Sequence, residues 1–317
     1  MTNIKQFYEK LAEKALFAGQ SHIFQNWEAL SADQQKKLLI QAETIDFEAL
    51  GRLTREYIHT PQNRHFQGHI ESVKPISIPK TSAEINLSQK MVPIGEKALR
   101  NGSVGVLLVA GGQGSRLGFD GPKGKFPITP VKQKSLFQLH AEKILALNRR
   151  YETRIPFYIM TSEANHEETK QFFYTHSYFG LPKTDVFFFQ QGMLPALDAN
   201  GKLILDAPGH LFMNPNGHGG VFEALSQSGV LADLDARGIE YIFYFQVDNV
   251  LIKMCDPVFL GHHIDAQAEM SSKVCAKRDA YEKVGVIGKI DGKLGVIEYS
   301  DMTEADKTAK DKNGALL

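Results

Sequence analysis

A short apolar run that opens into a glycine-dense loop is the feature that most limits how this chain can fold. The run extends from Val104 to Val109 and is almost unbroken, as expected for a strand buried on both faces of a parallel sheet. It continues into AGGQGSRLGFDGPKGK at residues 110–125. Glycine permits positive φ angles and close approach to a ligand, so consecutive N–H groups can converge on an anion. The pattern predicts a strand that feeds a phosphate-binding loop.

Two basic side chains of this loop add positive charge. Arg116 carries a planar fork that suits two phosphate oxygens, whereas Lys123 is a compact charge that suits one. Both are candidate catalytic residues. The candidates for nucleotide binding through the loop backbone are Ala110, Gly111, Gly112 and Gly114.

The glycine spacing separates this loop from two common phosphate-binding motifs. Gly112, Gly114 and Gly118 follow G-x-G-x-x-x-G, one residue longer than the dinucleotide fingerprint, and no window fits G-x-x-x-x-G-K-[ST]. No clear acidic residue closes a second strand about 20 residues later, which also disfavours an NAD-linked oxidoreductase. A tight glycine turn with surface basic residues is the structural alternative.

Strands and helices alternate after the loop, which predicts an α/β fold with a doubly wound parallel sheet. We expect helices at 135–150, 165–176 and 221–228, and strands at 156–160, 185–190 and 241–247. Ligands of such sheets bind outside the carboxyl ends of the strands. Three further segments at those ends therefore become candidate sites.

The region before the loop reads as mainly helical. Ser31 and Gln34 fit a capping box, prolines make 73–80 a linker, and a short helix at about 93–101 leads to the loop. The predicted division is a helical region with its linker at 1–95, a main α/β domain at 96–300 and a flexible polar tail at 301–317.

The charge balance excludes several classes of partner. The chain has 36 basic and 36 acidic residues, so no bulk field attracts nucleic acid or membrane, and any anion site must be local. No stretch approaches the roughly 20 apolar residues of a membrane span. The two cysteines lack metal-binding spacing, which favours a reduced, cytoplasmic setting.

Three further candidate residues lie just after a predicted strand or just before a predicted helix. Gln191 follows the strand at 185–190, Gly217 lies in NPNGHGG before the helix at 221–228, and Asp248 follows the strand at 241–247. An amide can donate and accept, a helix N-terminus favours anions, and a carboxylate suits a hard cation. A polar strand end or a simple turn cap is the ordinary alternative for each.

The motif GGQGSRLG followed by GPKGK closely resembles the nucleotide-binding signature of the eukaryotic-type UDP-sugar pyrophosphorylases, most of all those specific for UDP-N-acetylglucosamine. The resemblance runs through most of the chain. It implies a Rossmann-like, GT-A-like nucleotidyltransferase fold, a requirement for Mg²⁺, and UTP and a sugar 1-phosphate as substrates. It also implies that Gln191 pairs with uracil, that Gly217 and His218 contact uracil and sugar, and that Asp248 binds Mg²⁺.

The sugar is left open by one departure from the family pattern. UDP-N-acetylglucosamine enzymes usually carry Asn where His218 stands, and a G-H-G loop is similar to that of UDP-glucose pyrophosphorylases. The resemblance further assigns Gly285, in an EKVG turn, and Glu298 to the sugar. From the residues alone this segment is a β-hairpin around Asp291 and Gly292, which is usually scaffold.

The implied reaction is attack of a sugar 1-phosphate oxygen on the α-phosphorus of UTP. Arg116 would contact the departing pyrophosphate, Lys123 the α-phosphate and Asp248 the cation. Members of the family continue after the counterpart of Glu298 into more sugar contacts, a second lysine and a further domain. We therefore expect nucleotide binding with weakened or absent turnover, and a non-catalytic UDP-sugar-binding module is the alternative. The oligomeric state is left unassigned.

Overall fold

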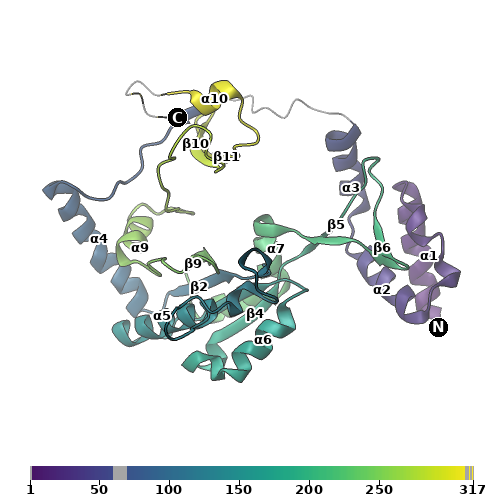
Figure 1. The fold of residues 1–317 in the computed structure, drawn as a ribbon, viewed down its shortest axis with the longest axis horizontal. Helices are drawn as coiled ribbons and strands as arrows, with labels where there is room; N and C mark the ends of the chain where they lie inside the picture. The colour runs from purple at the N-terminus through teal and green to yellow at the C-terminus, as the bar shows by residue number, and fades with distance from the viewer. Residues whose placement is uncertain (1, 60–69, 311–313, 315, 317) are drawn as a thin grey trace. The chain divides into compact units, whose positions relative to one another are not determined.

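The computed structural model describes residues 2–59, 70–310, 314 and 316, with the side chains of residues 2, 3 and 218 excepted. The chain divides into two compact units, and Figure 1 labels helices and strands of both. Unit 1 comprises residues 1–78, 195–212 and 272–317, and unit 2 comprises 79–194 and 213–271. The sequence-based division at 95 and 300 stays a prediction of domain boundaries, and the two units have different bounds.

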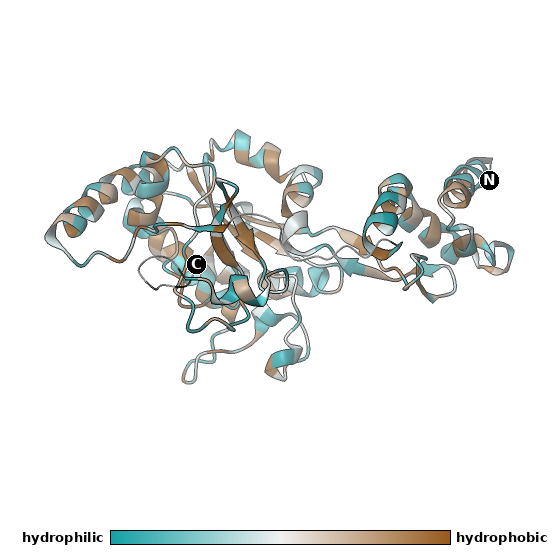
Figure 2. Cartoon of the chain, turned by 90° about the horizontal axis from the view of Figure 1, so that it is seen from above, coloured by the Kyte–Doolittle hydropathy of each residue, from teal (hydrophilic) through white to brown (hydrophobic). Residues whose placement is uncertain are grey.

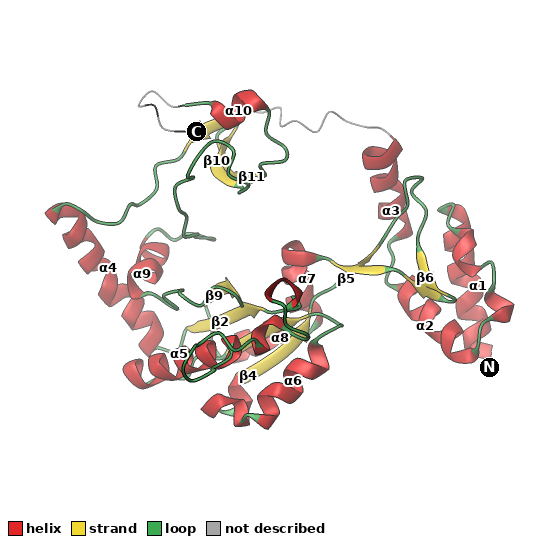
Figure 3. Ribbon diagram, viewed as in Figure 1, coloured by secondary structure: helices red, strands yellow, loops and turns green. Residues whose placement is uncertain are grey.

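Unit 2 contains a parallel four-stranded sheet in the order β4-β3-β2-β9 (Figure 3). Its strands are β2 (Val104–Val109), β3 (Phe157–Thr161), β4 (Val186–Gln190) and β9 (Tyr241–Gln246). The helices between them are α5 (Leu136–Tyr151), α6 (His166–Thr175), α7 (Val221–Gln227) and α8 (Val230–Ala236). This confirms the predicted α/β fold, and each predicted strand or helix of this region is present.

Helices cover both faces of the sheet, and its strands are the hydrophobic centre of Figure 2. Val106 and Leu108 of β2 point into a core shared with α5, α6, α4 (Ser82–Arg100) and α9 (Pro257–Asp265). Leu107, between them, points into a second core shared with α7 and α8. Because successive residues of a strand face opposite sides, this alternation is that of a doubly wound sheet.

Helix α4 (Ser82–Arg100) is much longer than the predicted helix at 93–101. It begins at a capping box made by Thr81 and Glu84, a signal that sequence reasoning missed, and it contains Pro93 in its interior rather than in its first turn. Helix α9 (Pro257–Asp265) crosses it closely. A Cβ on Gly95 would lie 2.1 Å from the carbonyl oxygen of Pro257, so this crossing requires glycine.

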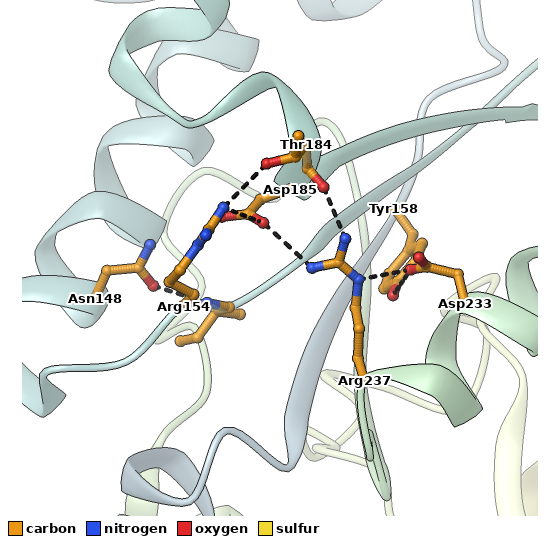
Figure 4. Close-up of polar contacts among 8 residues, drawn as sticks. Asn148, Arg154, Tyr158, Thr184, Asp185, Asp233 and Arg237 are labelled. Atoms are coloured by element: carbon orange, nitrogen blue, oxygen red, sulfur yellow. Dashed lines mark hydrogen bonds and ion pairs between the residues drawn. The ribbon is translucent and has the colours of Figure 1, made fainter.

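A polar network joins the amino ends of the sheet strands (Figure 4). Asp185, 1% exposed, accepts from Nε of Arg154 at 2.8 Å and from Nη1 of Arg237 at 3.2 Å. Arg237 also donates to Asp233, which accepts from the hydroxyl of Tyr158 at 2.7 Å. Burial raises the pKa of Tyr158, so this hydroxyl stays protonated. The network balances two guanidinium groups with two carboxylates.

Unit 1 begins with the helices α1 (Thr2–Phe17), α2 (Ala32–Glu43) and α3 (Phe47–Thr54). The capping box of Ser31 and Gln34 is present, as predicted. The predicted hairpin is also confirmed: β10 (Val286–Ile290) pairs with β11 (Lys293–Ile297), and its turn has φ of 49° at Asp291 and 81° at Gly292.

The predicted flexible tail contains a short helix, α10 (Glu304–Thr308), with a capping box between Thr303 and Asp306.

In the described part of the chain, no helix combines the length and hydropathy needed to cross a membrane. The remaining elements are β1 (Ile70–Ser72), β5 (Met193–Pro195), β6 (Leu205–Ala207), β7 (His210–Leu211), β8 (Met213–Pro215), the π-helix η3 (Arg55–His59) and the 3-10 helices η1 (Ser21–Phe24), η2 (Trp27–Ala29), η4 (Ser115–Leu117), η5 (Lys123–Lys125), η6 (Ser177–Gly180), η7 (Lys183–Asp185) and η8 (Gly217–Gly220).

Candidate functional site

The parallel register brings several predicted site residues to one edge of the unit 2 sheet. The backbone ladder continues one residue past the strands: Ala110 N donates to Met160 O at 2.7 Å, and Gln191 N donates to Thr161 O at 2.8 Å. Val247 N donates to the carbonyl oxygen of Val109, the last residue of β2, at 3.1 Å. The residues that follow β2, β4 and β9 therefore share the carboxyl edge, where ligands of such sheets bind.

Backbone hydrogen bonds connect the two halves of the glycine loop. Gly114 N donates to Gly121 O at 2.9 Å, and Lys123 N donates to Gly112 O at 3.0 Å. Asn165, which is 1% exposed at the start of α6, donates from Nδ2 to Ala110 O at 3.0 Å. Sequence reasoning missed Asn165, although a polar residue between a strand end and a helix was the available signal.

The predicted positive φ angles are absent at Gly111, Gly112 and Gly114, while the predicted close approach to a ligand stays a prediction. Positive φ angles occur at Gly118 (66°) and Gly121 (113°), whereas Gly114 has φ of −80°. Proximity is what excludes a side chain: a Cβ on Gly111 would lie 2.7 Å from Nε2 of Gln191. A Cβ on Gly114 would similarly lie 2.8 Å from the Phe119 ring. The loop backbone is thus pressed against neighbouring side chains.

Gln191 adjoins the second glycine-containing loop. Asn216 N donates to Gly192 O at 3.0 Å, and a Cβ on Gly192 would lie 2.5 Å from the Asn216 amide nitrogen. The Asn216 side-chain oxygen is buried and has no hydrogen-bond partner among the described residues. An orphaned acceptor beside Gln191 is a position that a ligand donor could satisfy.

The other residues of this loop are described in part. Gly217 has φ of 65°, so its left-handed backbone accounts for glycine there. The side chain of His218 lies outside the described part of the structure. Helix α7 is only 7 residues long, so the expected anion site at its N-terminus has little support from the helix dipole.

An ion pair links the glycine loop to the end of β9. Nζ of Lys123 lies 3.0 Å from Oδ2 of Asp248, and the two side chains are 21% and 50% exposed. The two predicted residues are 125 positions apart in the chain. Arg116, on η4, is exposed, and its side chain makes no hydrogen bond or ion pair with the residues that the structure describes. It is therefore available to an incoming anion.

The donor set at this edge fits a magnesium ion bound mainly by substrate. Within the described residues, no group of three or more His, Cys, Asp and Glu side chains could hold a metal by itself. Asp248 supplies one half-exposed carboxylate. Mg²⁺ is commonly held by one or two carboxylates together with phosphate oxygens and water, so a single carboxylate suffices.

Two residues of α5 support the segment that carries Asp248. The buried His140 contacts the carbonyl oxygen of Val247 through Nε2 at 2.8 Å. Burial lowers the pKa of His140 to about 4, so the imidazole is neutral near pH 7. Nζ of Lys143 donates to the carbonyl oxygens of Val250 and Ile252. Sequence reasoning placed these residues on a helix and gave them no role.

The two residues assigned to the sugar lie in unit 1. A Cβ on Gly285 would be 3.4 Å from Oε1 of Glu298, so the hairpin brings these two residues together as a pair. Both belong to the unit that contains β10 and β11, whereas the glycine loop, Gln191 and Asp248 belong to unit 2. Their assignment to the sugar stays a prediction.

Comparisons with known proteins match most of the chain. Residues 48–315 match the protein family described as UTP--glucose-1-phosphate uridylyltransferase. The UDP-N-acetylglucosamine pyrophosphorylase of Saccharomyces cerevisiae is 39% identical over 330 aligned residues, which cover 100% of this chain and 67% of that protein. UDP-N-acetylglucosamine diphosphorylase 2 of Arabidopsis thaliana is 37% identical and covers 98% and 64%.

A solved structure has the same fold. It is the uridine diphosphate N-acetylglucosamine pyrophosphorylase from Trypanosoma brucei in complex with inhibitor, with a TM-score of 0.83 and 30% sequence identity. The match covers 98% of this chain and 64% of that chain. The chain thus spans about two thirds of the length of the relatives it matches, from 64% to 67%.

Proposed function

The chain belongs to the UTP--glucose-1-phosphate uridylyltransferase family, and on that basis we propose that it condenses UTP with N-acetylglucosamine 1-phosphate. The products are UDP-N-acetylglucosamine and pyrophosphate. The observation that carries this proposal is the Lys123–Asp248 ion pair, which joins the glycine loop to the strand edge where a triphosphate would lie. The UDP-N-acetylglucosamine enzymes among the relatives support the choice of sugar.

Each proposed role follows from where the residue lies. The amide of Gln191, held against Gly111, can donate to and accept from the imide edge of uracil. Arg116 extends from the loop into solvent and can take two oxygens of the departing pyrophosphate. Lys123 exchanges its contact with Asp248 for an oxygen of the α-phosphate. Bound Mg²⁺ would neutralise phosphate charge from the side of Asp248.

The reaction is a single displacement at phosphorus. An oxygen of the sugar 1-phosphate forms a bond to the α-phosphorus, and the bond from that phosphorus to the pyrophosphate oxygen breaks. No enzyme nucleophile is needed, because the task is to align two polyanions and neutralise their growing charge. We place the reaction in the cytoplasm, since both cysteines are free thiols.

Glucose 1-phosphate is the second candidate for the sugar substrate. The G-H-G sequence around His218 and the description of the matched family favour it. Pyrophosphate release from UTP, measured with each sugar 1-phosphate and with Mg²⁺ or a chelator, decides between the two sugars. Titration calorimetry with UTP, both UDP-sugars and NAD complements it. UTP binding without pyrophosphate release would support a binding module, and NAD binding alone would contradict the proposal.

A further inference from the structure

Helix α5 contacts the backbone beside both members of the Lys123–Asp248 ion pair. On the lysine side, the fully buried ring of Phe137 lies directly against Gly124, where a Cβ would come within 2.1 Å of the ring. Leu136 N donates to Phe126 O at 3.1 Å. The first turn of α5 therefore holds the short η5 helix that begins at Lys123.

On the aspartate side, the next turn of α5 holds the residue before Asp248. A carbonyl oxygen can only accept, so Nε2 of His140 carries the proton in its 2.8 Å contact with Val247 O. The ring packs edge-on against Phe245 at 4.9 Å between centroids, and its Nδ1 has no partner among the described residues. Among the described residues, the imidazole therefore makes its hydrogen bond to the Val247 carbonyl alone.

Lys143 extends the same contact along the segment. It lies three residues after His140, on the same helical face, and its Nζ donates to Val250 O and, at 3.0 Å, to Ile252 O. Its partial burial lowers its pKa, but the ammonium group keeps two carbonyl acceptors. Three backbone carbonyls of residues 247–252 therefore accept hydrogen bonds from side chains of α5.

We propose that His140 and Lys143 are positioning residues that keep the carboxylate of Asp248 facing Lys123. The peptide bond between Val247 and Asp248 is planar, so fixing the Val247 carbonyl also fixes the nitrogen and Cα of Asp248. Lys143 fixes the chain two and four residues further on. Polar groups behind a metal-binding side chain commonly orient it in this way. This inference rests on the proposed function of Asp248.

The test compares full-length variants in two measurements. His140→Leu and Lys143→Met each replace a hydrogen-bond donor with an apolar side chain of similar size. His140→Gln retains a side-chain N–H donor, and Ile144→Ala is the control. Ile144 is fully buried on the same helix and belongs to the core on that face, so its truncation perturbs α5 without removing these bonds. The first measurement is hydrogen exchange of residues 247–252 without nucleotide. The second is the gain in UTP affinity on adding Mg²⁺, by titration calorimetry.

We expect His140→Leu and Lys143→Met to speed exchange in this segment by roughly tenfold or more relative to Ile144→Ala. We expect the Mg²⁺-dependent gain in UTP affinity to fall about 10–100-fold, with UTP affinity in chelator unchanged and partial recovery in His140→Gln. Unchanged exchange, or equal effects in Ile144→Ala, would overturn the positioning role. If His140→Leu does not fold, the same two measurements on Lys143→Met decide whether the positioning role holds. A wild-type chain that binds no UTP would contradict the proposed function, while the exchange measurement would still decide whether α5 holds this segment.

Discussion

Gly111 and Gln191 are in contact across the end of β3, which lies between their strands β2 and β4. A Cβ at Gly111 would stand 2.7 Å from Nε2 of Gln191 and 3.3 Å from the backbone nitrogen of Ser162. There is consequently no room for any side chain at Gly111 unless Gln191 moves. The position of the proposed uracil-binding amide depends on the absence of one methyl group.

Gly111→Ala should displace Gln191 and weaken UTP binding. One lost hydrogen bond corresponds to about 0.5–1.5 kcal/mol, or roughly two- to tenfold in Kd. Titration calorimetry on Gly111→Ala, Gln191→Ala and the double variant checks the mechanism. If the alanine acts through Gln191, the double variant should lose little more than either single one, and additive losses would contradict this.

Arg116→Ala and Lys123→Ala should each slow pyrophosphate release by roughly 100- to 1000-fold, as expected for one lost charge-assisted contact with a transferring group. Arg116 is exposed, so its variant should keep the wild-type melting temperature. Steady-state kinetics with saturating UTP and sugar 1-phosphate make the measurement. Wild-type turnover in both variants would refute these assignments.

Asp185→Asn should destabilise unit 2 without changing UTP affinity. The substitution leaves two guanidinium groups without their shared carboxylate. The free energy of unfolding should fall by about 3 kcal/mol, the lower end of the range for breaking a buried ion pair, because both arginines are partly exposed. Urea denaturation measures the loss. Glu167→Gln, which removes an exposed helical ion pair with Lys170, is the matched control and should change little.

His140 should make the metal-free protein less stable as the pH falls. Its folded pKa of about 4 lies below the ordinary histidine value of 6.5, so the unfolded state binds the proton first, and stability is lost from about pH 6.5 down to pH 4. The difference is worth about 3 kcal/mol by the conversion of 1.36 kcal/mol per pKa unit. Lys143 and Asp248 are the charged groups acting on the ring. Urea denaturation of wild type and His140→Gln in chelator should show this loss in wild type only, and parallel pH profiles would contradict the assignment.

Local signals in the sequence predicted much of unit 2 and the hairpin of unit 1. The apolar run of β2, the helix at α5 and the turn at Asp291 each follow from neighbouring residues, and the structure confirms them. The full length of α4 differs from the prediction because Pro93, which favours a helix start, lies in the helix interior, and the helix begins instead at the Thr81 capping box.

The contacts that support the site required the fold. His140 and Val247 are 107 positions apart, and Asn165 reaches Ala110 across 55 positions, so neither pairing has a local signature. The predicted positive φ at Gly111 was wrong, and the crowding there comes from a side chain 80 residues later in the chain. Sequence patterns predicted which residues stand at the strand ends, and tertiary packing decides what holds them there.

In the Lys123–Asp248 ion pair, each of these two charges has the other as its counter-ion. Under the proposed function, a free divalent cation that took Asp248 from Lys123 would leave the ammonium group without its counter-ion, and a free phosphate would leave the carboxylate in the same condition. A metal–nucleotide complex would replace both partners in one exchange. The pair would therefore favour the two opposite charges when they arrive together.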